Sequence, residues 1–249
     1  MSEPLHPSTR GFRAAADVYD RGRPEYPDEA VAWLADRLGI GPGRRVLDLA
    51  AGTGKLTRPL AATGAGVVAV EPLPEMLRLL VAAQPGVEAH EGTAEAIPLP
   101  DADVDAATVG QAFHWFRMDA ALAELHRVLR PGGGLGLVWN TRDQDDPIQA
   151  EITRLIRPLA GGTPAWLSQR GALAGRIAGE LFGPIEEQAF TMRQELDADG
   201  LAQRVLSISY VAAAPEPERR TIEGQLRDLA GDRIVSLPYT TLCYVSYRR

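Results

Sequence analysis

Short apolar runs alternate with segments of helical period along the first 140 residues of the chain. A run of four to eight mostly apolar residues between turn residues is typical of a parallel strand that is buried on both faces. The predicted strands of this kind are residues 44–50 and 66–71, and further strands are predicted at residues 87–92, 104–113 and 134–140. Apolar positions three and four residues apart predict helices at residues 27–39, 55–64, 72–86 and 118–130. This alternation favours a doubly wound parallel sheet with right-handed crossover helices.

The alternation changes after Asn140. Residues 143–183 predict short helices interrupted by Gly and Pro, which we interpret as a helical lid insertion. A strand is expected at 185–196 and an edge or antiparallel strand at 234–249, where every second residue is apolar. We therefore expect one Rossmann-like α/β domain, with a seven-stranded, mostly parallel sheet and an antiparallel C-terminal strand. Its predicted parts are N-terminal cap helices (1–43), a cofactor-binding core (44–142), the lid (143–183), and C-terminal strands and helices (184–249).

Composition narrows the possible partners. The chain has 249 residues and a net charge of −7, without a basic cluster, which argues against a nucleic-acid partner. It has no apolar run long enough to cross a membrane and no leader pattern, so we expect a cytoplasmic protein with no membrane partner. The single cysteine and four scattered histidines predict neither a disulfide nor a metal site. We expect a monomer or a homodimer.

The first predicted strand runs directly into a glycine-rich turn, A-G-T-G, at residues 51–54. Ligands of open α/β sheets bind at this place, where Gly52 and Gly54 can adopt positive φ and a helix start can meet an anionic group. The pattern is neither a dinucleotide fingerprint nor a phosphate-binding loop. A tight turn without a ligand remains an alternative interpretation.

The segment D48-L-A-A-G-T-G54 resembles the first motif of class I S-adenosylmethionine (SAM)-dependent methyltransferases, and further segments match in order over roughly residues 15 to 140. The resemblance implies SAM as cofactor, S-adenosylhomocysteine as product, and Glu71 as the acceptor of hydrogen bonds from the ribose hydroxyls. An ionised carboxylate suits that role because it only accepts hydrogen bonds. A solvated strand end is the alternative for Glu71.

The resemblance implies other cofactor contacts. Residues 93–95 would lie near the adenine amine, and residues 111–112 would flank the methionine part of SAM. Residues 19–27 resemble the N-terminal segment of a subgroup that includes trans-aconitate and ubiquinone-type methyltransferases. In that subgroup the equivalent tyrosine closes over the cofactor, which implies that Tyr19 and Arg23 meet the carboxylate of SAM. The implied cofactor-binding residues are Tyr19, Arg23, Asp48, Ala50, Gly52, Thr53, Gly54, Glu71, Pro72, Met76, Thr93, Ala94, Glu95, Gln111 and Ala112.

One residue departs from the family pattern. Ala50 stands where the first glycine of the usual loop would be, and an alanine is harmless there only if its φ is negative.

Methyl transfer from a sulfonium needs positioning and exclusion of water more than covalent help. His114 is the candidate general base, since its intrinsic pKa lies near neutrality; alternatively, His114 and Trp115 form a structural lip. Both, together with Trp166, are candidates for contact with the acceptor, although Trp166 would equally suit the lid core. The charged residues at 142–146 would meet a polar acceptor or cap a helix.

The sequence thus predicts a SAM-dependent methyltransferase that acts on a small-molecule acceptor by in-line displacement. Two alternatives remain: an RNA or protein methyltransferase on the same fold, and a SAM-binding protein without catalytic activity. The acceptor and its methylated atom, whether oxygen, nitrogen, carbon or sulfur, are not fixed by the sequence.

Overall fold

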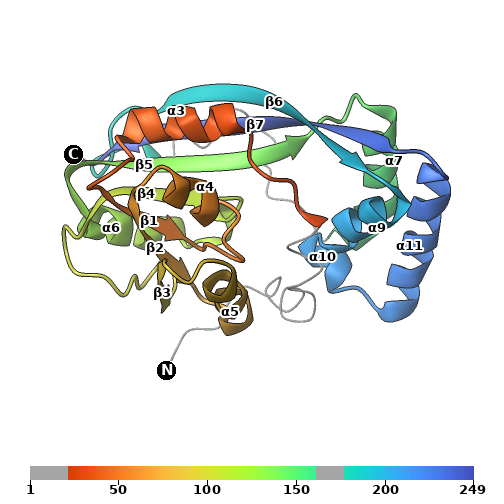
Figure 1. Cartoon of the computed structure of the whole chain (residues 1–249), viewed down its shortest axis with the longest axis horizontal. Coiled ribbons are helices and arrows are strands. Elements are labelled where there is room, and N and C mark those ends of the chain that lie inside the picture. The colour runs from red at the N-terminus through yellow and green to blue at the C-terminus, as the bar shows by residue number, and fades with distance from the viewer. Residues whose placement is uncertain (1–21, 161–176) are drawn as a thin grey trace. The chain divides into compact units, whose positions relative to one another are not determined.

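The computed structural model describes residues 22–160 and 177–249 (Figure 1). Contacts divide the chain into two compact units. We call one the sheet unit, with described residues 26–140, 177–190 and 241–249, and the other the helical unit, with described residues 22–25, 141–160 and 191–240. The expected single domain with a lid stays a prediction, and the two units are described separately.

A seven-stranded sheet has the order β3-β2-β1-β4-β5-β7-β6. Its strands are β1 (Arg45–Leu49), β2 (Gly66–Glu71), β3 (Glu88–Glu91), β4 (Val104–Gly110), β5 (Leu129–Arg142), β6 (Glu186–Leu196) and β7 (Val235–Tyr247). Strands β1 to β5 pair in parallel, with β1 between β2 and β4. The chain moves from β1 outward through β2 and β3 and then returns to β4, so the sheet has its topological switch point between β1 and β4.

Helices cover both faces of the parallel strands in the sheet unit. These helices are α3 (Asp28–Leu38), α4 (Thr57–Ala62), α5 (Pro74–Ala83) and α6 (Met118–Val128). Within β1, Val46 packs in the same apolar cluster as Leu34 of α3, whereas Leu47 packs in another cluster with Leu125 of α6. Successive side chains of a strand point to opposite faces, so β1 has to place apolar side chains on both of its faces. The predicted doubly wound fold is confirmed.

Strand β7 is antiparallel to β5, as expected for the C-terminal strand. Near one end of the pair Arg248 donates its backbone N–H to the carbonyl oxygen of Gly133 (2.9 Å), and farther along Thr241 Oγ1 donates to Asn140 Oδ1 (2.6 Å). Because β7 lies between β5 and β6, the edge strand at this end of the sheet is β6, and β3 forms the opposite edge. The edge alternative for the last strand was therefore wrong.

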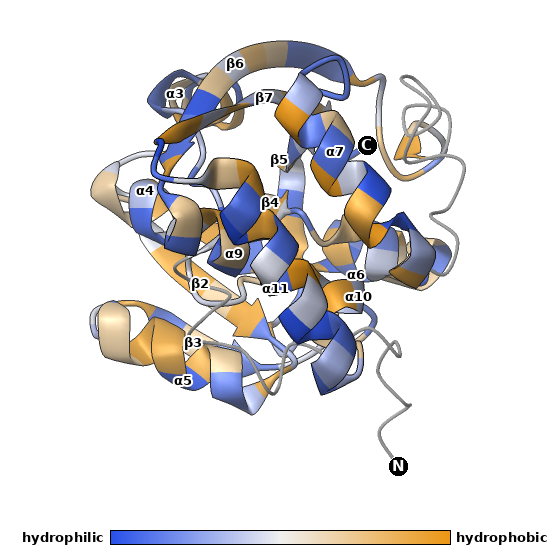
Figure 2. Ribbon diagram, turned by 90° about the vertical axis from the view of Figure 1, so that its right-hand side faces the viewer, coloured by the Kyte–Doolittle hydropathy of each residue, from blue (hydrophilic) through white to orange (hydrophobic). Residues whose placement is uncertain are grey.

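The helical unit has its own apolar core. It contains α7 (Pro147–Ile156), the short 3-10 helix η2 (Arg157–Leu159), α9 (Ala198–Leu206), α10 (Ser209–Ala212) and α11 (Glu216–Ala230). Figure 2 shows that each of α7, α9 and α11 carries both apolar and polar residues. Ile152 of α7, Leu201 of α9 and Leu226 of α11 are buried in one cluster. The helices of the predicted lid are thus partners of later helices; residues 161–176 of that insertion lie outside the described residues.

None of the helices in the described part of the chain is both long and apolar enough to cross a membrane.

Candidate functional site

The loop between β1 and α4 lies at the carboxyl end of β1, beside the switch point. The backbone N–H of Ala51 donates to the carbonyl oxygen of Val70 in β2 (3.2 Å), and that of Gly54 donates to the carbonyl oxygen of Ala51 (3.0 Å). Gly52 and Gly54 have φ of 59° and 89°. Both values lie in the left-handed region that favours glycine, so the loop needs the two glycines that the sequence places there.

Ala50 also has a positive φ, 56°. The condition under which an alanine would be harmless at this position is therefore not met. A left-handed conformation costs a residue with a Cβ atom about 1–2 kcal/mol. Gln111, at the end of β4, is in the same region with φ of 59°. Two strained residues thus follow the two strands that flank the switch point, and such strain often accumulates at functional sites.

Glu71, the last residue of β2, connects the glycine loop to the start of α5. Its Oε2 accepts a hydrogen bond from the backbone N–H of Gly52 (2.9 Å), and its Oε1 accepts one from that of Leu73 (3.0 Å). The residue is only 4% exposed. Each carboxylate oxygen can accept two hydrogen bonds, so both oxygens retain capacity for a ligand's hydroxyl groups. The alternative of a solvated strand end for Glu71 is therefore wrong.

Asp48 is buried one strand away, in β1. Its Oδ2 accepts a hydrogen bond from Thr57 Oγ1 of α4 (2.6 Å), while its Oδ1 is shielded from solvent and has no hydrogen-bond partner among the described residues. A buried carboxylate oxygen without a partner is costly. The arrangement therefore favours a hydrogen-bond donor or a positive charge beside Oδ1.

Both carboxyl groups hold protons unusually tightly. Burial raises the pKa of Asp48 to about 7, against the opposing hydrogen bonds from its threonine neighbours. Burial also raises the pKa of Glu71 to about 7; its two backbone hydrogen bonds lower that pKa, and the nearby Asp48 raises it. Pairs of buried groups with shifted pKa values are concentrated at functional sites. Burial thus favours the protonated form of both groups at pH values where an exposed carboxyl group would be ionised.

The end of β4 forms the other side of the switch point. A Cβ atom on Gly110 would lie 2.5 Å from Tyr26 Oη, so only glycine allows that tyrosine to approach. Gln111 donates its backbone N–H to the carbonyl oxygen of Val138 (2.9 Å) and its Nε2 to that of Asn140 (3.3 Å). These bonds fix Gln111 and the adjoining Ala112 to β5.

The three residues that were expected near the adenine, at positions 93–95, differ from one another in their surroundings. Thr93 pairs with Ala96 in an isolated bridge, and Ala94 is buried in the apolar core. Glu95 Oε1 accepts a hydrogen bond from the backbone N–H of Arg117 (2.8 Å), the residue before α6. Glu95 therefore has a structural role at the start of that helix, which its sequence context did not reveal.

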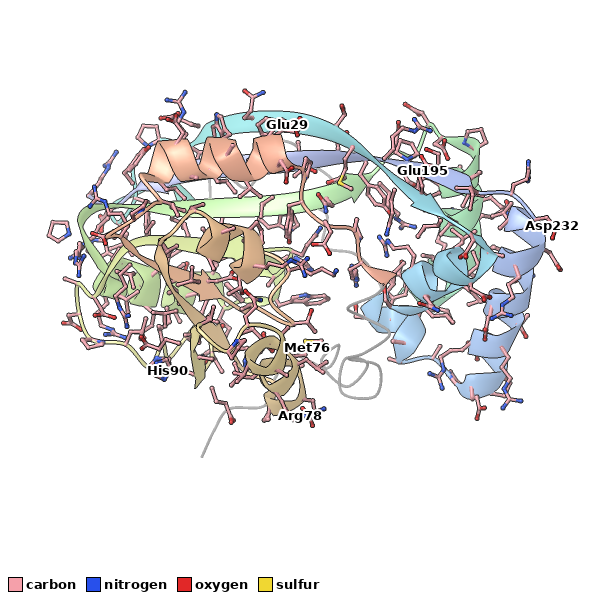
Figure 3. All side chains as sticks on the ribbon, viewed as in Figure 1. Glu29, Met76, Arg78, His90, Glu195 and Asp232 are labelled. Atoms are coloured by element: carbon pink, nitrogen blue, oxygen red, sulfur yellow. The ribbon has the colours of Figure 1, made fainter. Side chains whose placement is uncertain are left out.

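Pro72 and Met76 follow Glu71 into α5. Pro72 is partly buried, and Met76, labelled in Figure 3, is buried, with its Sδ 3.8 Å from the position that a Cβ on Gly52 would take. Met76 is thus a neighbour of the glycine loop. Thr53 within that loop is also buried.

His114 lies in a short 3-10 helix, η1 (Phe113–Trp115), just beyond β4. Its ring centre is 4.3 Å from that of Trp115, with an angle of 44° between the planes, and both residues are partly buried. The histidine and the tryptophan therefore lie together after the strand that ends at the switch point. Their catalytic and acceptor-binding roles stay predictions.

Three predicted site residues are not part of this arrangement. Tyr19 and Trp166 lie outside the described residues. Arg23 belongs to the helical unit, where its Nη2 donates to the carbonyl oxygen of Ser207 (3.1 Å). Their predicted contacts with cofactor and acceptor stay predictions. Among the residues that the structure describes, no three His, Cys, Asp or Glu side chains gather as a metal site would require.

Comparison with known proteins identifies the family. The family description "methyltransferase domain" matches residues 47–137, which extend from β1 into β5. A protein of Mycobacterium tuberculosis (strain ATCC 25618 / H37Rv), named an uncharacterized methyltransferase, is 40% identical over 248 residues and covers 93% of each chain. A Schizosaccharomyces pombe protein named an uncharacterized methyltransferase-like protein is 34% identical over 236 residues, covering 94% of this chain and 91% of its own. This chain belongs to the methyltransferase family.

A solved structure agrees with this assignment. The structure described as a candidate type II methyltransferase from Anaeromyxobacter dehalogenans has a TM-score of 0.64 and 27% identity, and covers 91% of this chain and 97% of its own. The family match includes most of the site: Asp48, the glycine loop, Glu71 and His114 all lie within it. The trans-aconitate and ubiquinone-type subgroup stays a prediction.

Sequence reasoning missed several residues that shape this methyltransferase site. Thr57 binds Asp48, Tyr26 lies against Gly110, and Gln84 donates its Nε2 to the carbonyl oxygen of Gly54 (3.1 Å). Thr57 could have been suspected, because a buried aspartate needs donors and the next helix starts nearby. Tyr26 and Gln84 carried no such signal.

The strain at Ala50 leads to the first prediction. Ala50→Gly should raise the free energy of unfolding by about 0.5–1 kcal/mol, because relief of the left-handed strain exceeds the additional backbone entropy that glycine loses on folding. Ala61→Gly, within α4, is the control and should lower the same quantity by about 1 kcal/mol. Urea unfolding measures both. A loss of stability in Ala50→Gly as large as in the control would contradict the strain.

The buried carboxyl groups lead to the second prediction. The unfolded pKa of an aspartate is about 3.9, so the folded protein, in which the pKa of Asp48 is about 7, retains a proton that the unfolded chain releases. That contribution to stability is complete below the unfolded pKa and is lost as pH rises through the folded pKa. Stability should therefore fall between pH 5 and pH 8, by on the order of 3 kcal/mol for this group.

Asp48→Asn should remove that part of the pH dependence, whereas Asp232→Asn, at an exposed position, should leave it unchanged. Thermal unfolding of the three proteins across this pH range measures the slopes. Equal slopes for the wild type and Asp48→Asn would mean that Asp48 is ionised throughout.

Proposed function

We propose that this methyltransferase uses SAM, which it binds at the carboxyl ends of β1, β2 and β4, and that it methylates a small molecule. The observation that carries the proposal is the carboxylate of Glu71, held at the end of β2 by the backbone N–H groups of Gly52 and Leu73. An acceptor-only group fixed in this way suits two adjacent hydroxyl groups, such as those of a ribose.

The other residues of the sheet unit fit the rest of the cofactor. Gly52, with φ of 59°, has no side chain, so a bulky group can approach the backbone of the loop there. The unpartnered Oδ1 of Asp48 suits the positive charge of SAM. Gln111 and Ala112 would flank the methionine part, and residues 93–95, with Pro72 and Met76, would lie around the adenosine.

The bound sulfonium supplies an activated methyl group, so the protein has to orient the acceptor and exclude water. The rigid end of β4 is suited to orientation, because Gln111 is fixed by two hydrogen bonds to β5. His114 would take the proton that an acceptor hydroxyl or amine loses, with Trp115 holding its ring. Arg23, Tyr19 and Trp166 are proposed to complete the cofactor and acceptor contacts.

A small-molecule acceptor is supported by the net charge of −7, since a nucleic-acid substrate calls for clustered basic residues. A protein acceptor would be compatible with that charge. Measuring S-adenosylhomocysteine production with a panel of metabolites, and separately with protein substrates, distinguishes the two. We propose a soluble, cytoplasmic enzyme that needs no metal.

The third prediction tests the role of Glu71 in cofactor binding. Glu71→Gln should weaken binding of SAM and S-adenosylhomocysteine by roughly 1–3 kcal/mol, because an amide NH₂ replaces one acceptor oxygen and faces a backbone N–H. Glu91→Gln is the matched control, since Glu91 pairs in register with Glu71 at the end of β3 and is exposed. Calorimetry in the presence of a chelator measures both dissociation constants.

The control should bind as the wild type does. If Glu71→Gln were to bind SAM as tightly as Glu91→Gln does, the cofactor would not rest on this strand end. Complete loss of wild-type binding on addition of the chelator would contradict metal independence.

A further inference from the structure

Two arginines of the helical unit, one buried and one partly buried, have no counter-charge among the described residues. Arg142 is the last residue of β5, and Arg204, 6% exposed, lies on α9. Arg204 donates its Nε to Tyr239 Oη (2.9 Å), and its guanidinium carbon is 5.6 Å from the centre of the same ring. Arg142 interacts with Tyr210 and Tyr239 and is close enough to Arg204 to be affected by its charge.

Neither guanidinium has a carboxylate within 4.0 Å in the part of the chain that the structure describes. The Nη1 of Arg142 and the Nη1 of Arg204 are both shielded from solvent and have no hydrogen-bond partner among the described residues. Arg127, a partly buried arginine of the sheet unit, binds by contrast both Glu124 and Asp101. Arg142 and Arg204 therefore lack, among the described residues, the carboxylate partners that Arg127 has.

The neighbouring residues of the same segment do not neutralise the pair. Asp146 Oδ1 accepts hydrogen bonds from the backbone N–H groups of Ile148 and Gln149, both at 3.0 Å, and so caps the start of α7. Asp143 accepts the backbone N–H of Asp145 (3.0 Å). The carboxylates that follow Arg142 thus serve the turn into α7, as the cap interpretation of this charged segment predicted.

Leaving such a pair unmatched is unfavourable. Burial lowers the pKa of Arg142, and the positive charge of Arg204 lowers it further, against the effect of the two tyrosines. A buried charge without a partner, and two like charges close together, both destabilise the folded protein. An anion between the guanidinium groups would reverse both penalties, because each planar group can donate two parallel hydrogen bonds to a carboxylate or phosphate.

We propose that the helical unit contains a binding site for a small anion, in which Arg142 and Arg204 hold one carboxylate or phosphate group. Tyr239 acts as a positioning residue, because its hydroxyl and ring fix the guanidinium of Arg204. The ligand class is a small organic acid or a phosphate ester. The proposal does not depend on SAM, since all the residues named belong to the helical unit.

The test uses the whole chain without SAM and three probes: succinate, inorganic phosphate and the uncharged succinamide. Side-chain Nε–H signals in NMR spectra report on the arginines directly. We expect the signals of Arg142 and Arg204 to shift with succinate or phosphate and not with succinamide. Tighter binding of succinate assigns the site to carboxylates, and tighter binding of phosphate assigns it to phosphate esters; both results support the proposal.

Variants separate a binding role from a structural one. Arg142→Met should weaken anion binding at least about tenfold, the loss expected for charge-assisted hydrogen bonds, without lowering the melting temperature of the anion-free protein. Arg154→Met is the matched control on α7, where the side chain is 69% exposed and paired with Glu151. The control should bind anions as the wild type does.

Three results would overturn the proposal. In the first, the arginine signals of the wild type respond to none of the anions. In the second, they respond equally to succinate and to succinamide. In the third, the Arg142→Met protein has a lower melting temperature yet binds anions as tightly as the wild type does. Because binding is measured without SAM, a protein that binds anions but not SAM would disprove the proposed function alone.

Discussion

The hydrogen bonds of one carboxylate hold the candidate site together. Glu71 ends β2, and its two oxygens accept the backbone N–H groups of Gly52 in the first loop and Leu73 before α5. Neither N–H has a partner within its own turn, so the carboxylate satisfies donors from two separate segments at once. Without it the glycine loop would lose its hydrogen-bonded link to the start of α5, and the surface that faces a ligand would lose its main acceptor.

Several features of the sheet unit lower the free energy of unfolding at the positions where they would favour binding of a ligand. Asp48 and Glu71 are buried with pKa values of about 7, and Ala50 and Gln111 have left-handed backbones. All four lie at the carboxyl ends of β1, β2 and β4 or in the loops that follow these strands. Such costs persist in proteins when the surrounding structure fixes them, and active sites are where they are most often found. Arg142 and Arg204 of the helical unit each have a solvent-shielded nitrogen without a partner among the described residues, which is a comparable cost with a positive charge.

The local sequence pattern was sufficient to predict the strands and the glycine loop. Residues 67–70 are apolar because both faces of β2 are covered, and a motif that spans adjacent residues, such as Asp48 to Gly54, needs no tertiary knowledge. The sign of φ at Ala50 could not be predicted, because it depends on how the loop is fixed to β2. Arg142 and Arg204 are far apart in sequence, and only the fold of the helical unit, in which Arg204 binds Tyr239 of β7, brings them together. Long-range pairing of this kind has no periodic signal.

The central claim is that the carboxylate at the end of β2 receives the hydroxyl groups of the cofactor. The pKa of Glu71 is about 7 in the free protein, and hydroxyl donors favour the ionised form, so binding should release a proton. The direct measurement is the dissociation constant of S-adenosylhomocysteine across pH 5.5 to 8. The account predicts that binding tightens as pH rises, by up to about tenfold per pH unit below the pKa, and becomes constant above it. A dissociation constant that does not change with pH, or that rises with it, would contradict the account.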